Sequence, residues 1–297
     1  MAIQKIMVPF LNEEPGLSAL AAAAAIADRF KAHIDVVHLR PTISPAQVAG
    51  GFSGGYYPIA VDYVESTVKE FDANAQQQAA DLNALFAAFC DKYDIARHEQ
   101  AAHSQAKGAA AAWSDIGPAT TFDFSKRARV ADLAVIAKTG ADATLSETEM
   151  FEDLVFQSGR PVLITPSNKS GFAFPEQIIV AWDGGREAAR AVAGALPILR
   201  EARLVSVVSV GEIRAGSESA ERAAAHLKLH GVHATSVSLD VAKGADAEQA
   251  FLTHAIEDKM ELIVMGAYSH SRWREVIWGG FTRELLRQSE IPLLMAH

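Results

Sequence analysis

The sequence predicts an α/β protein made of two doubly wound, Rossmann-like domains in tandem, each with a parallel sheet. Two observations carry this prediction. Unbroken apolar runs alternate with helix-like segments along the chain, a pattern typical of parallel strands that helices cover on both faces. The same series of segments also occurs twice, which indicates a duplicated module. We assume the strand order 3-2-1-4-5 within each sheet.

The two copies match at both ends. Each opens with a strand, a loop, an alanine-rich helix and a second strand, and each closes on a last strand that a proline introduces. The matching segments are residues 5–41 with 177–212, 131–140 with 260–269, and 158–166 with 289–297. A small, polar stretch at 167–171 reads as a linker. We therefore expect domains at residues 1–168 and 172–297.

The first copy is longer than the second between its second and fourth strands. Residues 50–58 form a glycine-rich aromatic loop, and the stretch that follows predicts a helix of about 30 residues at roughly 60–92. Such a helix either packs on its own sheet or covers the other half or a partner chain. The third strand is expected at 233–240 in the second copy and, from a weaker pattern, at 96–102 in the first. The helix stripe comprises Val61, Val64, Val68, Phe71, Ala75, Gln78, Leu82, Leu85 and Phe89.

Composition and charge exclude several classes of protein. Hydrophobic residues make up 49% of the chain and its net charge is −9, so it has material for two cores but an acidic surface that disfavours nucleic acid. No apolar run reaches the roughly 18 residues of a membrane span. The single cysteine, Cys90, cannot form a disulfide within the chain and reads as a small buried residue rather than a reactive thiol. A cytoplasmic location is expected.

The strand-end loops of the second copy are the candidate binding site. Ligands of doubly wound sheets bind beyond the carboxyl ends of the strands where strand order reverses, here the first and the fourth. Asp183 follows the first of these strands, and its carboxylate could accept hydrogen bonds from a ribose or an adenine amino group. Capping of the next helix is an alternative role for the same carboxylate.

The loop after the fourth strand has features of an anion site. Gly266 permits close backbone approach, and Gly279 and Gly280 precede a helix whose first N–H groups and dipole favour an anion. Thr282 adds a hydroxyl, and the basic residues His270, Arg272 and Arg274 lie in the same loop. In the alternative reading, the glycines only serve turns.

These residues resemble the nucleotide site of universal stress proteins. The resemblance to that family covers both halves of the chain, and the second half is the better match. Members that bind ATP carry an Asp after the first strand, matched by Asp183, and a motif G-x2-G-x9-G followed by Ser or Thr after the fourth. Gly266 and Gly279 match its first and third glycines. Ser269 stands at the second glycine and Gly280 at the hydroxyl position, and both depart from the motif.

The resemblance implies a stress-response protein that binds an adenine nucleotide, with Mg²⁺ as a potential companion, in its second half. The alternative is a degenerate member that binds no nucleotide and acts through protein contacts. Slow ATP hydrolysis is less favoured, because nothing but proximity in sequence places a general base, and no P-loop, dinucleotide or hydrolase motif occurs. No catalytic or metal site is assigned, and His226 and His230 read as solvated. The candidate binding residues are Ala181, Trp182, Asp183, Gly184, Val208, Met265, Gly266, Ser269, His270, Arg272, Gly279, Gly280, Phe281 and Thr282.

Two further expectations concern how the halves work together. Single-domain relatives pair as dimers, so the final strands of the two halves, which are short apolar sheet edges, should pair as an intrachain pseudo-dimer; further homo-oligomers could form. The first half lacks a carboxylate at the position of Asp183 and carries Asn12 nearby. Glu147, Glu149, Glu152 and Asp153 follow its fourth strand and would repel phosphates, although Lys138 and Thr139 could meet a small anion. At most one nucleotide per chain is expected.

Overall fold

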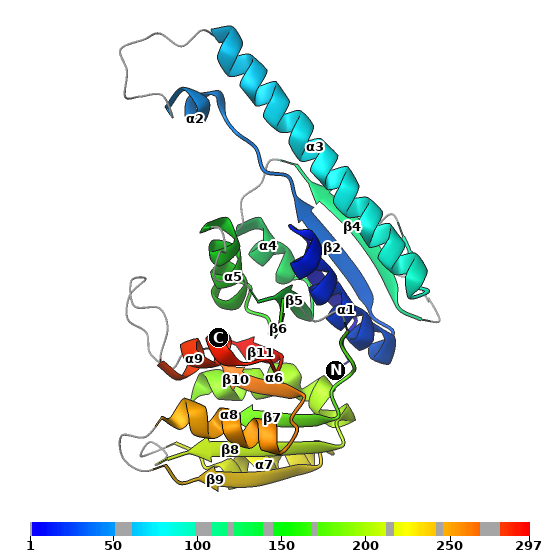
Figure 1. Ribbon diagram of the computed structural model, residues 1–297. Helices are drawn as coiled ribbons and strands as arrows, with labels where there is room; N and C mark the ends of the chain where they lie inside the picture. Colours follow the sequence, from blue (N-terminus) through cyan, green and yellow to red (C-terminus); the bar gives the residue numbers. More distant parts are fainter. Residues whose placement is uncertain are drawn as a thin grey trace.

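The computed structural model describes residues 2–50, 61–98, 108–117, 122–138, 145–167, 171–211, 217–241, 246–267 and 280–297. Within them the two halves share one sheet of 11 strands (Figure 1). The strands follow the order β3-β4-β2-β1-β5-β6-β11-β10-β7-β8-β9 across this sheet. The expected architecture, a largely parallel sheet with helices on both faces, is confirmed.

The elements alternate along the chain in both halves. The first half contains β1 (Lys5–Pro9), α1 (Glu13–Phe30), β2 (His33–Leu39), α2 (Pro45–Gly50), α3 (Val61–Lys92), β3 (Ala96–Arg97), β4 (Ala110–Ile116), α4 (Phe122–Ala128), β5 (Leu133–Ala137), α5 (Leu145–Gln157) and β6 (Val162–Thr165). The second half contains β7 (Gln177–Ala181), α6 (Arg186–Glu201), β8 (Leu204–Val210), α7 (Ala220–Leu229), β9 (Ala234–Leu239), α8 (Ala247–Glu257), β10 (Leu262–Gly266), α9 (Gly280–Gln288) and β11 (Leu293–Ala296).

Each half has the assumed strand order. In the second half β9-β8-β7-β10-β11 is the order 3-2-1-4-5, and β4-β2-β1-β5-β6 repeats it in the first half. The halves meet where β6 pairs with β11 in antiparallel register, with Leu163 opposite Leu294. Two short apolar edges thus cover each other. The predicted pairing of the final strands is confirmed.

The prediction for the third strand of the first half is wrong. Among the described residues of the expected segment, which end at His98, Ala96 and Arg97 form the two-residue strand β3, and the third strand of the doubly wound order is β4. β4 begins with three alanines, Ala110, Ala111 and Ala112, all buried. Alanine favours helices and is depleted in strands, so its residues gave no strand signal. Burial between β2 and β3 decides the conformation here.

The duplication extends to how the first strand of each half is held. The Asp132 carboxylate accepts hydrogen bonds from the backbone N–H groups of Gln4 and Lys5, at 2.8 and 3.0 Å. The Glu261 carboxylate does the same for the N–H groups of Glu176 and Gln177, at 2.6 and 3.1 Å. In both copies, an acidic residue just before the fourth strand therefore fixes the start of the first strand.

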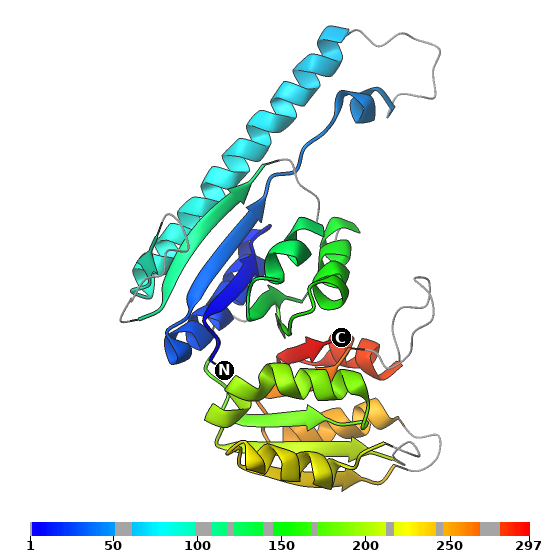
Figure 2. The ribbon, with the colours of Figure 1, turned by 180° about the vertical axis from the view of Figure 1, so that it is seen from behind.

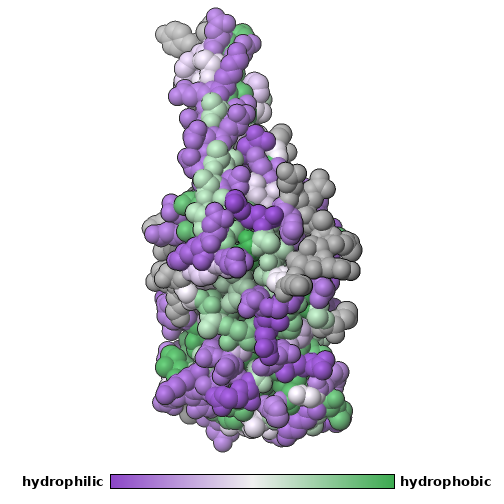
Figure 3. Space-filling model, turned by 90° about the vertical axis from the view of Figure 1, so that its right-hand side faces the viewer, coloured by the Kyte–Doolittle hydropathy of each residue, from purple (hydrophilic) through white to green (hydrophobic). Residues whose placement is uncertain are grey.

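The N-terminal part of the long helix α3 projects from the body (Figures 1 and 2). Its C-terminal half packs on the first half of the sheet and buries Leu82, Phe86 and Phe89. Toward its N-terminus the stripe is exposed or half-buried, with Val61 70% exposed, and α2 is its neighbour there. Figures 1 and 2 show α3 pointing away from the second half, so the alternative that it covers that half is wrong. On the face drawn in Figure 3 the projecting end is mainly hydrophilic, with a narrow hydrophobic strip.

Two apolar clusters, one on each face of the sheet, run through both halves. One includes Ile6, Ile34, Val180 and Val264, under α1, α3, α6 and α7. Cys90 belongs to this cluster and is fully buried, and burial raises the pKa of its thiol to about 11. The interpretation of Cys90 as a buried small residue is confirmed.

Candidate functional site

The candidate site lies at the carboxyl ends of β7 and β10, where the strand order of the second half reverses. The two strands are parallel neighbours, and Ala181 stands opposite Met265 at their ends. Beyond β7 the backbone N–H of Trp182 donates to the Val208 carbonyl at 2.8 Å. The Trp182 indole N–H donates to the Glu218 carbonyl, also at 2.8 Å. The indole thus ties the loop after β7 to the segment that precedes α7.

Asp183 is exposed at the tip of this loop. Its Oδ1 accepts a hydrogen bond from the Gly185 N–H at 2.8 Å, a turn that holds the carboxylate in place. The N-cap of α6 is Gly185, and no side chain caps it. Capping of α6 by Asp183, one of its two expected roles, is therefore not observed, and the carboxylate is presented to solvent at the sheet edge.

Two glycines of the candidate set are explained by the packing of the chain itself. Gly184 has a φ of +73°, and a Cβ there would stand 2.5 Å from Cβ of Ser217. A Cβ on Gly266 would stand 2.6 Å from the Ala188 nitrogen and 2.7 Å from the Glu187 carbonyl carbon. The end of β10 is therefore flush against the first turn of α6. This agrees with the alternative in which glycines serve the backbone.

The structure adds Glu187, which sequence reasoning missed. Its side chain is 5% exposed and accepts a hydrogen bond from Arg186 Nε at 2.5 Å. Burial alone would raise the pKa of this carboxyl, but the bond from Arg186, its own backbone N–H, and the charges of Arg186 and His297 together hold the pKa below its ordinary value. Glu187 thus places a negative charge beside Gly266. In sequence it stands in an ordinary charged helix start, so nothing marked it.

The other candidate residues fall into three groups. Val208, Met265 and Thr282 are buried, at 1%, 3% and 7% exposure, so their side chains belong to the layer beneath the crevice. Ala181 and Phe281 are half-buried, and the Phe281 ring packs edge-on against Phe251 at 5.6 Å between centroids. Gly280 opens α9. Ser269, His270, Arg272 and Gly279, and with them Arg274, lie outside the described residues.

The corresponding crevice of the first half is lined by side chains that bond to one another or to the opposite half. Asn12 Nδ2 donates to Glu147 Oε1 at 2.7 Å, and the cavity around them measures about 230 Å³. Lys138 Nζ donates to the carbonyls of Arg287 and Ser289 in the second half, at 3.0 and 3.2 Å. The ammonium expected to meet a small anion is thus engaged between the halves. Thr139 lies outside the described residues.

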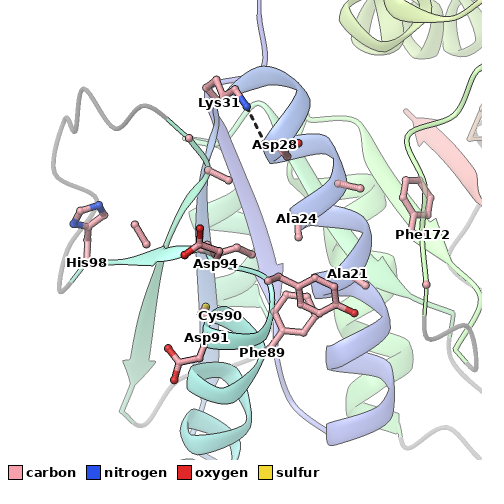
Figure 4. Close-up of a pocket in the computed structure, with 17 residues that line it drawn as sticks. Ala21, Ala24, Asp28, Lys31, Phe89, Cys90, Asp91, Asp94, His98 and Phe172 are labelled. Atoms are coloured by element: carbon pink, nitrogen blue, oxygen red, sulfur yellow. Dashed lines mark hydrogen bonds and ion pairs between the residues drawn. The ribbon is translucent and has the colours of Figure 1, made fainter.

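A larger groove of about 1190 Å³ lies away from the strand ends, between α1 and the C-terminal end of α3. Ala21 and Ala24 of α1 and Phe89 of α3 line it (Figure 4). Carboxylates stand among its lining residues, and one of them, Asp28, pairs with Lys31 at 2.9 Å. No residue of the predicted site lines this groove.

Across the described ranges, no three His, Cys, Asp or Glu side chains are grouped so that they could hold a metal ion. His226 on α7 and His230, the C-cap of that helix, are exposed, with ring centroids 4.8 Å apart. None of the helices in the described part of the chain has the length and hydrophobicity that a membrane crossing requires.

Comparison with known proteins extends the description from fold to family. The strand order defines a tandem doubly wound α/β protein. The model of the Universal stress protein family matches residues 175–297. A universal stress protein of Synechocystis sp. is 24% identical over 171 residues, which are 55% of this chain and 57% of that protein. The alignment thus spans little more than half the length of that relative.

Solved structures resemble the whole chain. A universal stress protein from Archaeoglobus fulgidus superposes with a TM-score of 0.65 and 15% identity, covering 98% of this chain and 95% of that one. A universal stress protein from Pseudomonas aeruginosa gives 0.56 and 15%, covering 99% and 93%. At these identities the likeness establishes the fold. The second half of the chain is a universal stress protein domain, and the whole chain has the tandem fold of such proteins, as the sequence predicted.

Proposed function

We propose that this chain is a cytoplasmic stress-response protein that binds one adenine nucleotide in its second half and acts as a sensor or regulatory module. The observation that carries the proposal is the placement of Asp183. Its carboxylate is exposed and held by the Gly185 N–H at the carboxyl end of β7, beside β10. A fixed, solvated carboxylate at the reversal of strand order suits the hydroxyls of a ribose or the amino group of adenine.

The first half supports a stoichiometry of one. Its crevice holds Asn12 bonded to Glu147, and Leu11 stands where the second half has Asp183. Lys138, the cation at the end of β5, is bound to carbonyl oxygens of the second half, across the joint that β6 and β11 form between the halves. A nucleotide would have to displace these contacts in the first half, whereas the described contacts of Asp183 leave its carboxylate accessible.

A second candidate function is a protein that binds no nucleotide and works through protein contacts. Glu187 favours it, because a buried carboxylate that stays ionised beside Gly266 repels a phosphate chain passing over β10. The departures at Ser269 and Gly280 point the same way. The two candidates differ in a property that can be measured directly.

The deciding measurement is mass spectrometry of nucleotide released from freshly purified protein. We expect AMP, ADP or ATP at close to one molecule per chain. Calorimetric titration of the nucleotide-free chain with ATP should then give a stoichiometry near one. Asp183→Ala should weaken binding about 10- to 100-fold, the equivalent of one hydrogen bond to a charged group.

Asn12→Ala is the matched control, because it alters the same strand-end loop of the other half and should leave the affinity unchanged. Two equivalent sites per chain, or an affinity indifferent to Asp183, would overturn the assignment. If neither released nucleotide nor heat of binding is found, the second candidate function is the correct one.

A further inference from the structure

The first half holds the last helix of the second half by its C-terminal end. Lys138 follows β5, and its Nζ donates to the Arg287 and Ser289 carbonyls at 3.0 and 3.2 Å. α9 ends at Gln288, so these carbonyls belong to the helix end, where backbone oxygens have no partner within the helix. β11 contacts α5 of the first half, and Figure 1 shows α9 and β11 on the side of the second half that faces the first.

A cation at this end stabilises the last turn of α9 and fixes the position of that end of the helix. The helix dipole is negative at its C-terminus, so the ammonium both satisfies the carbonyls and stabilises the helical conformation. Burial lowers the pKa of Lys138, an effect that Glu290 opposes and Arg287 reinforces. The opposite end of α9 begins at Gly280, roughly 12 Å away at the rise of an α-helix, and belongs to the candidate nucleotide site.

A second contact from the first half supports the loop after β10 indirectly, through His297 at the end of the second half. His297 Nδ1 donates to the Ala267 carbonyl at 2.8 Å, and Ala267 directly follows Gly266. The Phe156 ring of α5 packs edge-on against the His297 imidazole, with centroids 5.1 Å apart. The end of α9 is therefore held directly by Lys138 of the first half. The loop after β10 is held by His297 of its own half, against which Phe156 of the first half packs.

We infer that Lys138 is a positioning residue for the nucleotide site of the second half: it acts across the joint by fixing α9, so that the first half serves as a scaffold for that site. The inference rests on the proposed function. In the aligned repeat, Ala267 of the second half stands at the position of Lys138. Because alanine has no side-chain donor, this position of the second half cannot hold the first half in the same way.

The test is calorimetric titration with ATP of the full chain and three variants, each first shown by circular dichroism to be folded. Lys138→Met keeps the length of the side chain and removes its donors and charge. We expect about fivefold weaker binding, the size of one charge lost from a helix end. Lys138→Arg restores donors and charge and should bring the affinity back. Lys126→Met removes an exposed lysine of α4 that pairs with Asp123 at 2.9 Å, and should bind as the wild type does.

The outcomes separate the inference from the function beneath it. A wild-type chain that binds no ATP would refute the proposed function, and the inference with it. ATP binding that is equal in the wild type and in Lys138→Met would refute the inference alone. So would a loss of affinity that Lys138→Arg fails to restore, because the cause would then be packing rather than the donors of Lys138.

Discussion

Replacing Gly266 by alanine tests the contact on which the geometry of the candidate site depends. The new Cβ would stand 2.6 Å from the Ala188 nitrogen and 2.7 Å from the Glu187 carbonyl carbon. Both are backbone atoms of the first turn of α6, so no side-chain rotation can relieve the clash. Ordinary contact begins at 3.4 Å, so β10 and α6 would have to separate by roughly 0.8 Å. Overpacking of this kind costs about 1–3 kcal/mol.

Urea unfolding followed by circular dichroism measures this cost as a shift in the midpoint at constant slope. Gly171→Ala is the control, because a Cβ at Gly171 meets nothing within 4 Å and its backbone is not in the left-handed region. We expect the control to change stability by less than about 0.5 kcal/mol. Equal midpoints for the two variants would refute the flush packing of β10 on α6.

The long helix α3 and the Cys90 thiol give two further predictions. Leu82→Ala should cost about 2–5 kcal/mol because Leu82 is 5% exposed, whereas Phe71→Ala should cost less because Phe71 is only half-buried; equal shifts in urea midpoint would contradict the projection of α3. Cys90 should resist an aromatic disulfide reagent at pH 8 and react fully in denaturant, because a pKa of about 11 leaves about one thiolate in a thousand. Native protein that reacts as fast as a free thiol would show that Cys90 is not enclosed.

The parts of the fold that could be predicted are the buried strands that consist mainly of branched apolar residues. β7, β8 and β10 are rich in Ile, Val and Leu, and the carboxyl end of β7 locates the Asp183 loop. The strand order was supplied by the general rule for doubly wound sheets. β4 was missed because its alanines give no strand signal and are held in the sheet by their neighbours.

The parts of the candidate site that were not predictable depend on contacts between distant segments. Nothing in the sequence around Glu187 distinguishes it from an exposed helix residue, and its burial follows from the close approach of β10 at Gly266. Lys138 was interpreted within its own half, as a local cation. Its actual partners are carbonyls about 150 residues further along the chain. No local pattern in a single sequence indicates a contact between residues so far apart.

A comparison of equivalent positions in the two halves separates what the fold requires from what a site requires. Asp132 and Glu261 perform the same task, which is to hold the start of the first strand. The strand ends are different. Where β7 leads to an exposed Asp183, β1 leads to Leu11 and to Asn12, which is bonded to Glu147. Lys138, at the end of β5, lines the crevice of its own half, but its Nζ bonds to carbonyls of the opposite half. The joint between β6 and β11 makes this division workable, because it brings the strand-end residues of one half within reach of the helices of the other. A duplicated module whose copies share one sheet can thus assign binding to one copy and support to the other, and this is the arrangement that the Lys138 variants test.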